Sequence, residues 1–275
     1  MAVKHLAVDI GMTNIDLVLE TETGQVRHMM ANQQRSAADQ LRQALYAIAD
    51  ELTPGMTVGV TGGRYRDLPK ALDGFQIMQV DEMLALGRGG LALGQRTSGL
   101  VVSAGTGTAM VAAGPKGVEH VTGSGVGGGT LLGLSRLILG TKDVHEIDEL
   151  ALAGDASAVD IMLSEAVGGE VGRLPADANA VNLGKLDRNG QDASRENLAA
   201  GLVRLVAQVI AVIAINASNA VDLPEIIMVG HLMDLKSIRN EVCLVGKFYN
   251  CEFIIPEQPG FGTALGVLEV LKDGS

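Results

Sequence analysis

A run of glycines constrains this chain more than any other feature. Residues 121–137 read VTGSGVGGGTLLGLSRL, with five glycines between Gly123 and Gly129. Glycine loses more conformational entropy on folding than any other residue, so such a cluster needs a physical reason, such as close approach of the backbone to another group. The apolar residues that follow predict a helix beginning at Thr130. Free N–H groups and the helix dipole make its N-terminus an anion site. We predict a phosphate cradle; the alternative is a hinge or tight turn.

Two common phosphate motifs do not describe this run. A Walker A loop needs a Lys directly after the glycines, and none follows here. A dinucleotide fingerprint needs a preceding strand and a downstream acid at a set spacing, and both are poorly placed.

Composition narrows the class of partner. The chain has 275 residues, 47% of them hydrophobic, with a net charge of −11. This is a globular composition that can form a sizeable core and two modest domains. A nucleic-acid partner would need a basic face, so we predict none. A small anionic ligand needs only local N–H groups and one or two cations, and it stays possible.

The cysteines and the apolar runs predict the cellular compartment of the protein. Cys243 and Cys251 have neither a disulfide framework nor metal-ligand spacing, which is typical of free thiols in a reducing compartment. The N-terminal apolar run is too short for a signal peptide. The longest apolar run, 202–217, contains Arg204 and Gln208 and is too short to span a bilayer comfortably. We therefore predict a soluble cytoplasmic protein without a membrane partner.

Hydrophobic periodicity predicts strands mainly in the first half and helices mainly in the second. The predicted strands are a strand-turn-strand over 5–19, then 26–30, 56–60, 75–80, 100–102, 109–113, 118–121, 225–229 and 251–255. The predicted helices are 36–52, 83–93, 130–139, 143–153, 158–167, 194–219, 234–245 and 262–271, with a loop over 173–192. Ser36 and Ser194 are the expected N-caps. This pattern favours an α/β protein of two lobes, each a mixed sheet with flanking helices, with a ligand between them.

Small residues follow several of the predicted strands. The turns are 9–13, 61–63, 105–108, the glycine run, and 230–231. Backbone N–H groups and hydroxyls at strand ends suit nucleotide phosphates, although five ordinary turns would look the same.

Three titratable positions adjoin these turns. Asp9 is a candidate Mg²⁺ ligand, because Mg²⁺ bound with triphosphate takes one or two carboxylates; a turn aspartate capping its own backbone is the alternative. Asp81 and Glu82 stand between a strand end and a helix start. Either one is a candidate general base toward a hydroxyl, or both are acids favoured by the helix dipole. His120 precedes the glycine run and is a candidate contact for an anionic substrate; a structural or solvent-facing histidine is the alternative.

Together, segments 79–91, 105–108, 121–134 and 260–266 resemble the type II pantothenate kinases. The resemblance extends in order over nearly the whole chain and is strongest from Val101 to Leu137. It implies the two-lobed actin-like ATPase fold with ribonuclease H-like lobes, an N-terminal lobe over 1–98 and a C-terminal lobe over 99–275. It also implies ATP between the lobes, Mg²⁺, a homodimer, and transfer of the γ-phosphate to the primary hydroxyl of pantothenate, the first step of coenzyme A biosynthesis.

The resemblance also assigns roles to single positions. Glu82 matches the catalytic base, and Asp9, Gly11 and Thr13 match the first phosphate motif, with Asp9 as the Mg²⁺ ligand. The residues expected to bind the nucleotide in the C-terminal lobe are Gly105, Gly107, Gly125, Gly127, Gly128, Gly129 and Gly230. The residues expected to contact the substrate are Thr106, Thr108 and His120.

The chain departs from the family pattern at Met12, Asp16 and His120. The family has Gly, Lys and Arg there, and the Lys contacts ATP phosphates while the Arg helps to hold substrate. A neutral His cannot reproduce a bidentate, permanently charged guanidinium. The candidate replacements for these two cations are Arg64, Arg66, Arg88, Lys116 and Arg136.

The departures leave three hypotheses. The first is a pantothenate kinase, and the second is a kinase of the same fold with a different hydroxyl substrate. The third is a non-kinase nucleotide-binding accessory or reactivating protein. Turnover with pantothenate and with other alcohols separates the first two hypotheses. ATP binding without acceptor-dependent transfer would favour the third.

Overall fold

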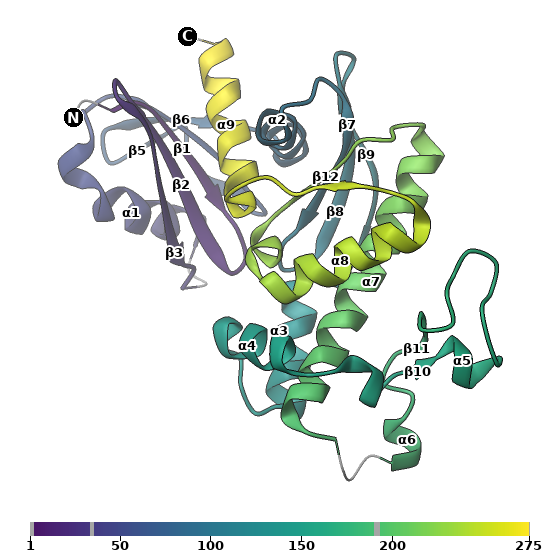
Figure 1. The fold of residues 1–275 in the computed structure, drawn as a ribbon. Coiled ribbons are helices and arrows are strands. Elements are labelled where there is room, and N and C mark those ends of the chain that lie inside the picture. The colour runs from purple at the N-terminus through teal and green to yellow at the C-terminus, as the bar shows by residue number, and fades with distance from the viewer. Residues whose placement is uncertain (1–2, 34–35, 190–192, 275) are drawn as a thin grey trace. The chain divides into compact units, whose positions relative to one another are not determined.

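The computed structural model describes residues 3–33, 36–189 and 193–274. The chain forms two compact units (Figure 1), and each is described by itself. The first unit comprises Met1–Val101, Val111–Val121 and Pro256–Ser275, and the second comprises Val102–Met110 and Thr122–Ile255. The closing helix therefore lies with the N-terminal strands, whereas the division predicted from sequence puts it in the C-terminal lobe.

The first unit is built on a six-stranded sheet of order β3-β2-β1-β4-β6-β5. Its strands are β1 (Val3–Ile10), β2 (Asn14–Thr21), β3 (Gly24–Ala31), β4 (Thr57–Gly62), β5 (Ala71–Leu72) and β6 (Phe75–Gln79). Strands β1, β2 and β3 form an antiparallel meander, while β1–β4 and β4–β6 are parallel pairs. The carboxyl ends of β1, β4 and β6 therefore meet at one edge, where the predicted turns 9–13 and 61–63 lie.

Side chains alternate between the two faces of this sheet. On one face, Leu6, Val8 and Ile10 pack with Leu41 and the other apolar residues of α1 (Ala37–Ala47). On the other face, a smaller cluster joins Ala7 and Val18 to α2 (Glu82–Gly94) and α9 (Gly262–Asp273). The Ser36 side chain accepts a hydrogen bond from Asp39 N, which confirms the predicted N-cap of α1.

Helices α2 and α9 pack backbone against backbone. A Cβ on Gly266 would lie 1.7 Å from Ala85 O, and a Cβ on Gly89 would lie 1.7 Å from Gly262 O. No larger residue fits at either crossing point, so these glycines hold α9 against the helix that begins at Glu82.

A five-stranded sheet has the order β13-β12-β7-β8-β9. Its strands are β7 (Gly99–Ala104), β8 (Thr108–Gly114), β9 (Gly117–Ser124), β12 (Ile226–Val229) and β13 (Phe253–Ile254). The boundary between the two units runs through β7, β8 and β9. Except for α1, α2 and α9, the helices belong to the second unit. They are α3 (Gly128–Ile138), α4 (Val144–Ala153), α5 (Leu163–Ala166), α6 (Leu186–Asn189), α7 (Arg195–Val221) and α8 (Lys236–Tyr249).

Helix α7 is the central helix of the second unit and contacts α3, α4, α8 and β12 (Figure 1). Ser194 caps it through Asn197 N, as predicted. At 27 residues, α7 is long and apolar enough to cross a membrane by length and composition alone, so the expectation that this segment is too short was wrong. In the structure 61% of its most apolar window is buried against neighbouring elements, as in the core helix of a globular domain.

One predicted helix is absent. Residues 158–167 form instead the end of a 3₁₀ turn, strand β10 (Ile161–Met162) and the short helix α5; β10 pairs with β11 (Asn179–Val181). The physical reason is Asp160, which is fully buried. Its Oδ1 accepts a hydrogen bond from Leu183 N at 2.7 Å, and its Oδ2 lies 3.4 Å from the Arg204 guanidinium. These long-range bonds override the local helical pattern. The loop predicted over 173–192 likewise contains β11 and α6.

The remaining short elements are 3₁₀ turns: η1 (Ala49–Glu51), η2 (Tyr65–Asp67), η3 (Ala156–Ala158), η4 (His231–Asp234) and η5 (Pro259–Phe261).

Candidate active site

In the first unit, the turn after β1 carries the predicted phosphate motif. In the β1–β2 register, Asp9 stands directly opposite Asp16, so both carboxylates project from the same face of the sheet. Asp9 is half-buried and Asp16 is only 4% exposed. Met12, where the family has Gly, is 74% exposed at the tip of the turn. Two carboxylates rather than one therefore mark this strand end.

Two residues missed by sequence reasoning hold this turn. Asn32, just after β3, donates from Nδ2 to Gly11 O at 2.5 Å and from its backbone N to Thr13 O at 2.8 Å. Gln40 of α1, buried to 6% exposure, donates in turn to Asn32 Oδ1 at 2.7 Å. A chain of amide hydrogen bonds thus fixes Gly11 and Thr13 from outside the motif. Nothing in the local sequence marks it, because the partners are far apart along the chain.

Helix α9 points its N-terminus toward the same sheet edge. Near its C-terminal end, the Lys272 ammonium pairs with Glu20 at 2.7 Å, toward the far end of β2. Five residues earlier, Val267 packs where a Cβ on Gly59 would stand, and Gly59 pairs with Ala7. The helix therefore runs from the Asp9 edge toward Glu20. Its positive dipole end lies on the phosphate-motif side, where it favours anions.

Glu82, the predicted base, is the first residue of α2. Asp81 is the N-cap; its Oδ1 accepts from Met83 N at 3.1 Å and from Leu84 N at 3.2 Å. Burial raises the pKa of Glu82, and the charge of Asp81 raises it further. A raised pKa suits a carboxylate that must accept a hydroxyl proton.

The second carboxylate oxygen of Asp81 contacts Tyr65 and Arg66, and the sequence did not predict these contacts. Asp81 Oδ2 accepts from Tyr65 Oη at 3.2 Å and from Arg66 Nη2 at 3.4 Å. Arg66 Nε also donates to Tyr65 Oη at 3.1 Å, and its guanidinium carbon lies 5.3 Å from the Tyr65 ring centre. Thr61 Oγ1 donates to Val80 O at 2.9 Å and ties the ends of β4 and β6 together. One carboxylate thus links the loop after β4 to the start of the helix that carries Glu82.

The second unit contains the glycine run, and the structure corrects one premise about it. The helix begins at Gly128, two residues before the predicted start at Thr130. Its first N–H groups are not free: Gly128 N donates to Gly105 O, and Gly129 N to Thr106 O, both at 2.8 Å. Gly127 N faces Thr130 Oγ1 at 3.3 Å. The glycine run is therefore fastened to the 105–108 turn rather than presenting these N–H groups to a ligand.

Steric space separates the glycines into two groups. A Cβ on Gly127 would lie 2.7 Å from Thr106 O, and one on Gly128 would lie 3.0 Å from Gly105 O. A Cβ on Gly129 would lie 2.9 Å from the Thr106 methyl carbon. Chain packing alone thus requires glycine at Gly127, where the clash is with backbone, and it disfavours a side chain at Gly128 and Gly129.

Gly125 differs, because a Cβ there would meet nothing within 4 Å. Gly105 and Gly107 are nearly as open, with nearest atoms at 3.9 Å and 3.4 Å. At Gly125, Gly105 and Gly107, therefore, a ligand remains a reason for glycine.

The predicted substrate threonines have different settings. Thr108 is buried and donates from Oγ1 to Val126 O at 2.8 Å, so its hydroxyl proton is used in a hydrogen bond within the protein. Thr106 is half-buried, and its carbonyl accepts from α3. His120 lies exposed on the part of β9 that belongs to the first unit.

Two positive-φ glycines occupy equivalent strand ends. Gly230, after β12, has φ 98°, and its Cβ would lie 2.4 Å from Ala104 O at the end of β7. Gly62, at the end of β4, has φ 112°, and its Cβ would lie 2.2 Å from Ile10 O at the end of β1. Only glycine fits either site. The same device in both units is consistent with two lobes of related design.

The structure also sorts the candidate replacement cations. Arg88 pairs with Asp273 at 2.8 Å and Arg64 pairs with Asp67 at 3.0 Å, so both already have carboxylate partners other than Asp81 and Glu82. Lys116 lies exposed in the β8–β9 turn, and Arg136 lies exposed in the last turn of α3. Arg66 alone of the five contacts the residue next to the predicted base.

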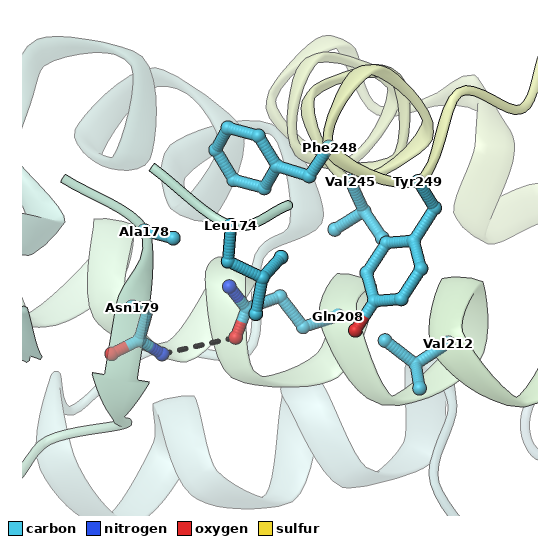
Figure 2. Close-up of a pocket in the computed structure, with 8 residues that line it drawn as sticks. All are labelled: Leu174, Ala178, Asn179, Gln208, Val212, Val245, Phe248 and Tyr249. Carbon is cyan, nitrogen blue, oxygen red and sulfur yellow. Dashed lines mark hydrogen bonds between the residues drawn. The ribbon is translucent and has the colours of Figure 1, made fainter. Parts of the chain in front are cut away.

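Figure 2 shows a small pocket of the second unit, between α7, α8 and the segment that leads into β11. Its lining residues are Leu174, Ala178, Asn179, Gln208, Val212, Val245, Phe248 and Tyr249. Asn179 Nδ2 donates to Gln208 Oε1 at 3.0 Å. None of the predicted site residues lines this pocket, so it has no role in the site described above.

The architecture is that of the actin-like ATPases and sugar kinases, which confirms the predicted fold. Component A of (R)-2-hydroxyglutaryl-CoA dehydratase from Acidaminococcus fermentans superposes with a TM-score of 0.65 at 14% identity, over 98% of this chain and 99% of that one. A ROK family glucokinase from Streptomyces griseus, in complex with glucose and AMPPNP, superposes with a TM-score of 0.61 at 13% identity, over 98% and 99%. At these identities the likeness shows the fold alone.

The family follows from the sequence comparison. Residues 93–253 match the model of the Fumble family, and the chain belongs to that family. It is similar to the type II pantothenate kinase of Oceanobacillus iheyensis, with 26% identity over 65% of this chain and 68% of that protein. It is also similar to the Bacillus cereus (strain ATCC 10987 / NRS 248) enzyme of the same name, with 22% identity over 96% of both. The chain is a kinase, a phosphotransferase with an alcohol group as acceptor, and the predicted resemblance is confirmed.

Proposed function

We propose that this kinase transfers the γ-phosphate of ATP to the primary hydroxyl of pantothenate. The names of the relatives support this acceptor, and the Bacillus cereus enzyme aligns along almost its whole length. The order of motifs from Asp9 to the closing helix supports it as well. The product would be 4'-phosphopantothenate, an intermediate on the way to coenzyme A.

The observation that carries the proposal is Glu82. It is a half-buried carboxylate at the first residue of α2, with a pKa raised by burial and by Asp81. Phosphoryl transfer depends mainly on positioning and charge neutralisation, with one carboxylate to accept the proton of the attacking hydroxyl. We assign that role to Glu82. Its carboxylate would hold the hydroxyl and take its proton as the hydroxyl oxygen attacks the γ-phosphorus. The bond from that phosphorus to the bridging oxygen of the β-phosphate would break, and ADP would leave.

Magnesium would bind at the end of β1. The donor set fits, because Asp9 and Asp16 project from the same face and Mg²⁺ prefers carboxylate oxygen. Mg²⁺ in kinases needs only one or two carboxylates, and phosphate oxygens and waters complete its shell. Bound there, the ion neutralises phosphate charge. Asp16, in the place of the family Lys, would act through this ion rather than on the phosphate directly.

In the first unit, Gly11 and Thr13 would contact nucleotide phosphates. In the second unit, the open space beside the backbone at Gly105, Gly107 and Gly125 would leave room for a nucleotide group. Gly127, Gly128 and Gly129 would act indirectly, by fixing the loop on the 105–108 turn through the hydrogen bonds described above.

The test is a coupled ADP-release assay with purified protein, ATP, Mg²⁺ and pantothenate. Glu82→Gln removes the base but keeps the size of the side chain, and Glu51→Gln, at an exposed position in η1, is the matched control. A general base contributes about 10²- to 10⁴-fold, so Glu82→Gln should lower kcat by that factor with little change in the KM for ATP. Glu51→Gln should match the wild type.

Absence of pantothenate-dependent ADP release at saturating ATP and Mg²⁺ would exclude pantothenate. Turnover of another alcohol under the same conditions would keep the kinase and change the acceptor. ATP binding by calorimetry, without transfer to any acceptor, would favour a non-kinase nucleotide-binding protein.

We also propose a cytoplasmic homodimer. Cys243 and Cys251 are both free thiols, which agrees with a reducing compartment. Leu137, at the end of α3, is 82% exposed, and Ile138 beside it is 40% exposed, which favours a covered surface in solution. Sedimentation equilibrium tests the dimer: a single species at the monomer mass of 28.5 kDa across the micromolar range would refute it.

A further inference from the structure

We propose that Arg66 is the cation that binds the carboxylate of the acceptor, in place of the family Arg whose position holds His120. This inference rests on the proposed function and adds a specificity-determining residue to it. The observations that carry it are the contacts of Arg66, the weakness of its resting ion pair, and the place of its partner Asp81 directly before Glu82 in the chain.

The guanidinium of Arg66 is held in place by two residues, but only some of its N–H groups donate hydrogen bonds to them. Nε donates to Tyr65 Oη and Nη2 donates to Asp81 Oδ2, and the ring of Tyr65 lies 5.3 Å below the guanidinium carbon. A guanidinium has five N–H donors, so most of the fork has no acceptor among these contacts. The side chain is 77% exposed, which leaves those donors open to a ligand.

The resting pair is readily exchanged. Arg66 Nη2 and Asp81 Oδ2 are 3.4 Å apart, long for a charge-assisted hydrogen bond, and Asp81 is itself 50% exposed. Exposed ion pairs contribute little to stability. A carboxylate ligand that offers two oxygens to the planar fork competes well against one distant oxygen, because bidentate geometry suits arginine. Asp81 would keep its bonds to the first turn of α2 through Oδ1 while the guanidinium turns to the ligand.

The negative charge near Glu82 makes a cation such as Arg66 necessary for binding an anionic acceptor. Asp81 and Glu82 put two carboxylates side by side where the acceptor hydroxyl must approach, in a chain of net charge −11. An anionic acceptor would be repelled there without a nearby cation. Pantothenate carries its hydroxyl at one end and its carboxylate at the other, so one molecule can present the hydroxyl to Glu82 and the carboxylate to a neighbouring cation.

The experiment compares two acceptors that share the hydroxyl end. Pantothenate ends in a carboxylate, whereas in pantetheine a neutral amide takes the place of that group. Steady-state kcat and KM are measured for both in wild type, Arg66→Gln and Arg66→Lys. Arg64→Gln is the matched control, since Arg64 is similarly exposed but pairs with Asp67. Melting temperatures of all four proteins verify that each is folded.

A charge-assisted bidentate contact corresponds to about 10- to 100-fold in affinity. Arg66→Gln should therefore lower kcat/KM for pantothenate by about that factor, through KM, and leave pantetheine and the KM for ATP unchanged. Arg66→Lys should fall in between, and Arg64→Gln should match the wild type.

Three results would overturn the inference alone: equal losses on both acceptors, no loss on pantothenate, or the same loss in Arg64→Gln. A wild-type protein that turns over neither acceptor would instead overturn the proposed function. The wild-type measurement thus distinguishes the two failures.

Discussion

The glycine run has two different physical reasons for its glycines, and a pair of substitutions separates them. A Cβ on Gly127 would lie 2.7 Å from Thr106 O and 2.8 Å from the Cα and carbonyl carbon of Gly107. Because ordinary Cβ contacts begin at 3.4 Å and the neighbours are backbone, the loop would have to move by about 0.7 Å.

That displacement has a calculable cost. Overpacking of this kind costs about 1–3 kcal/mol. Moving the loop also strains the two 2.8 Å hydrogen bonds that join the start of α3 to the 105–108 turn, each contributing about 1 kcal/mol. We therefore expect Gly127→Ala to lower the free energy of unfolding by about 2–4 kcal/mol.

Gly125→Ala is the matched control in the same loop. Nothing lies within 4 Å of the added Cβ, and the backbone there does not have positive φ. Stability should be unchanged or rise by about 0.4–1 kcal/mol, since alanine restricts the unfolded chain. If a phosphate approaches this backbone, the added methyl group should weaken ATP binding instead, by roughly tenfold or about 1.4 kcal/mol.

Urea unfolding followed by circular dichroism gives the stabilities of the wild type and the two variants, and calorimetry gives the Kd for ATP. An unfolding midpoint of Gly127→Ala equal to that of the wild type would refute the packing explanation. Equal destabilisation by both substitutions would show that the free space at Gly125 has been misread. Unchanged ATP affinity in Gly125→Ala would remove that glycine from the nucleotide site.

Two further predictions concern charged groups. Because the base must be ionised, kcat/KM falls as pH drops through the pKa of Glu82, which burial and the charge of Asp81 raise. Asp81→Asn keeps an N-cap but removes that charge, so the acidic limb of the pH profile should move to lower pH; a fixed limb would contradict the electrostatic link. Asp160→Ala should destabilise the fold by about 3 kcal/mol, because it removes one partner of the largely buried Arg204 and leaves a backbone N–H without its acceptor. Asp67→Ala, which breaks an exposed ion pair, should change the free energy of unfolding by less than about 0.5 kcal/mol. Similar losses of stability in Asp160→Ala and Asp67→Ala would refute the role of burial.

Local signals predicted most of the elements. Alternation and apolar runs located the strands from β1 to β4 and from β7 to β9, and Ser36 and Ser194 cap the helices that they were expected to cap. These signals work because caps, periodicity and turn glycines act within a few residues of one another. The family resemblance rests on the same kind of local motif, and it gave the fold class and the kinase class correctly.

Long-range partners explain what sequence reasoning missed. Asn32 and Gln40 support Gly11 although they come from other elements. Asp160 prevents a helix because Leu183 and Arg204 lie next to it in space. A buried carboxylate takes the hydrogen bonds that its surroundings offer, and those surroundings exist only after the chain has folded.

The sequence by itself determined that the chain is an α/β kinase with glycine turns at strand ends and a carboxylate pair at the start of α2. Only the tertiary structure decided why several of the glycines are there, that α9 returns to the N-terminal sheet, and that Arg66 contacts Asp81, the residue before the predicted base. The physical reason is distance along the chain. Turns, caps and periodic faces are set by neighbours in sequence, whereas steric space, burial and ion pairing are set by residues that meet only when sheets and helices pack.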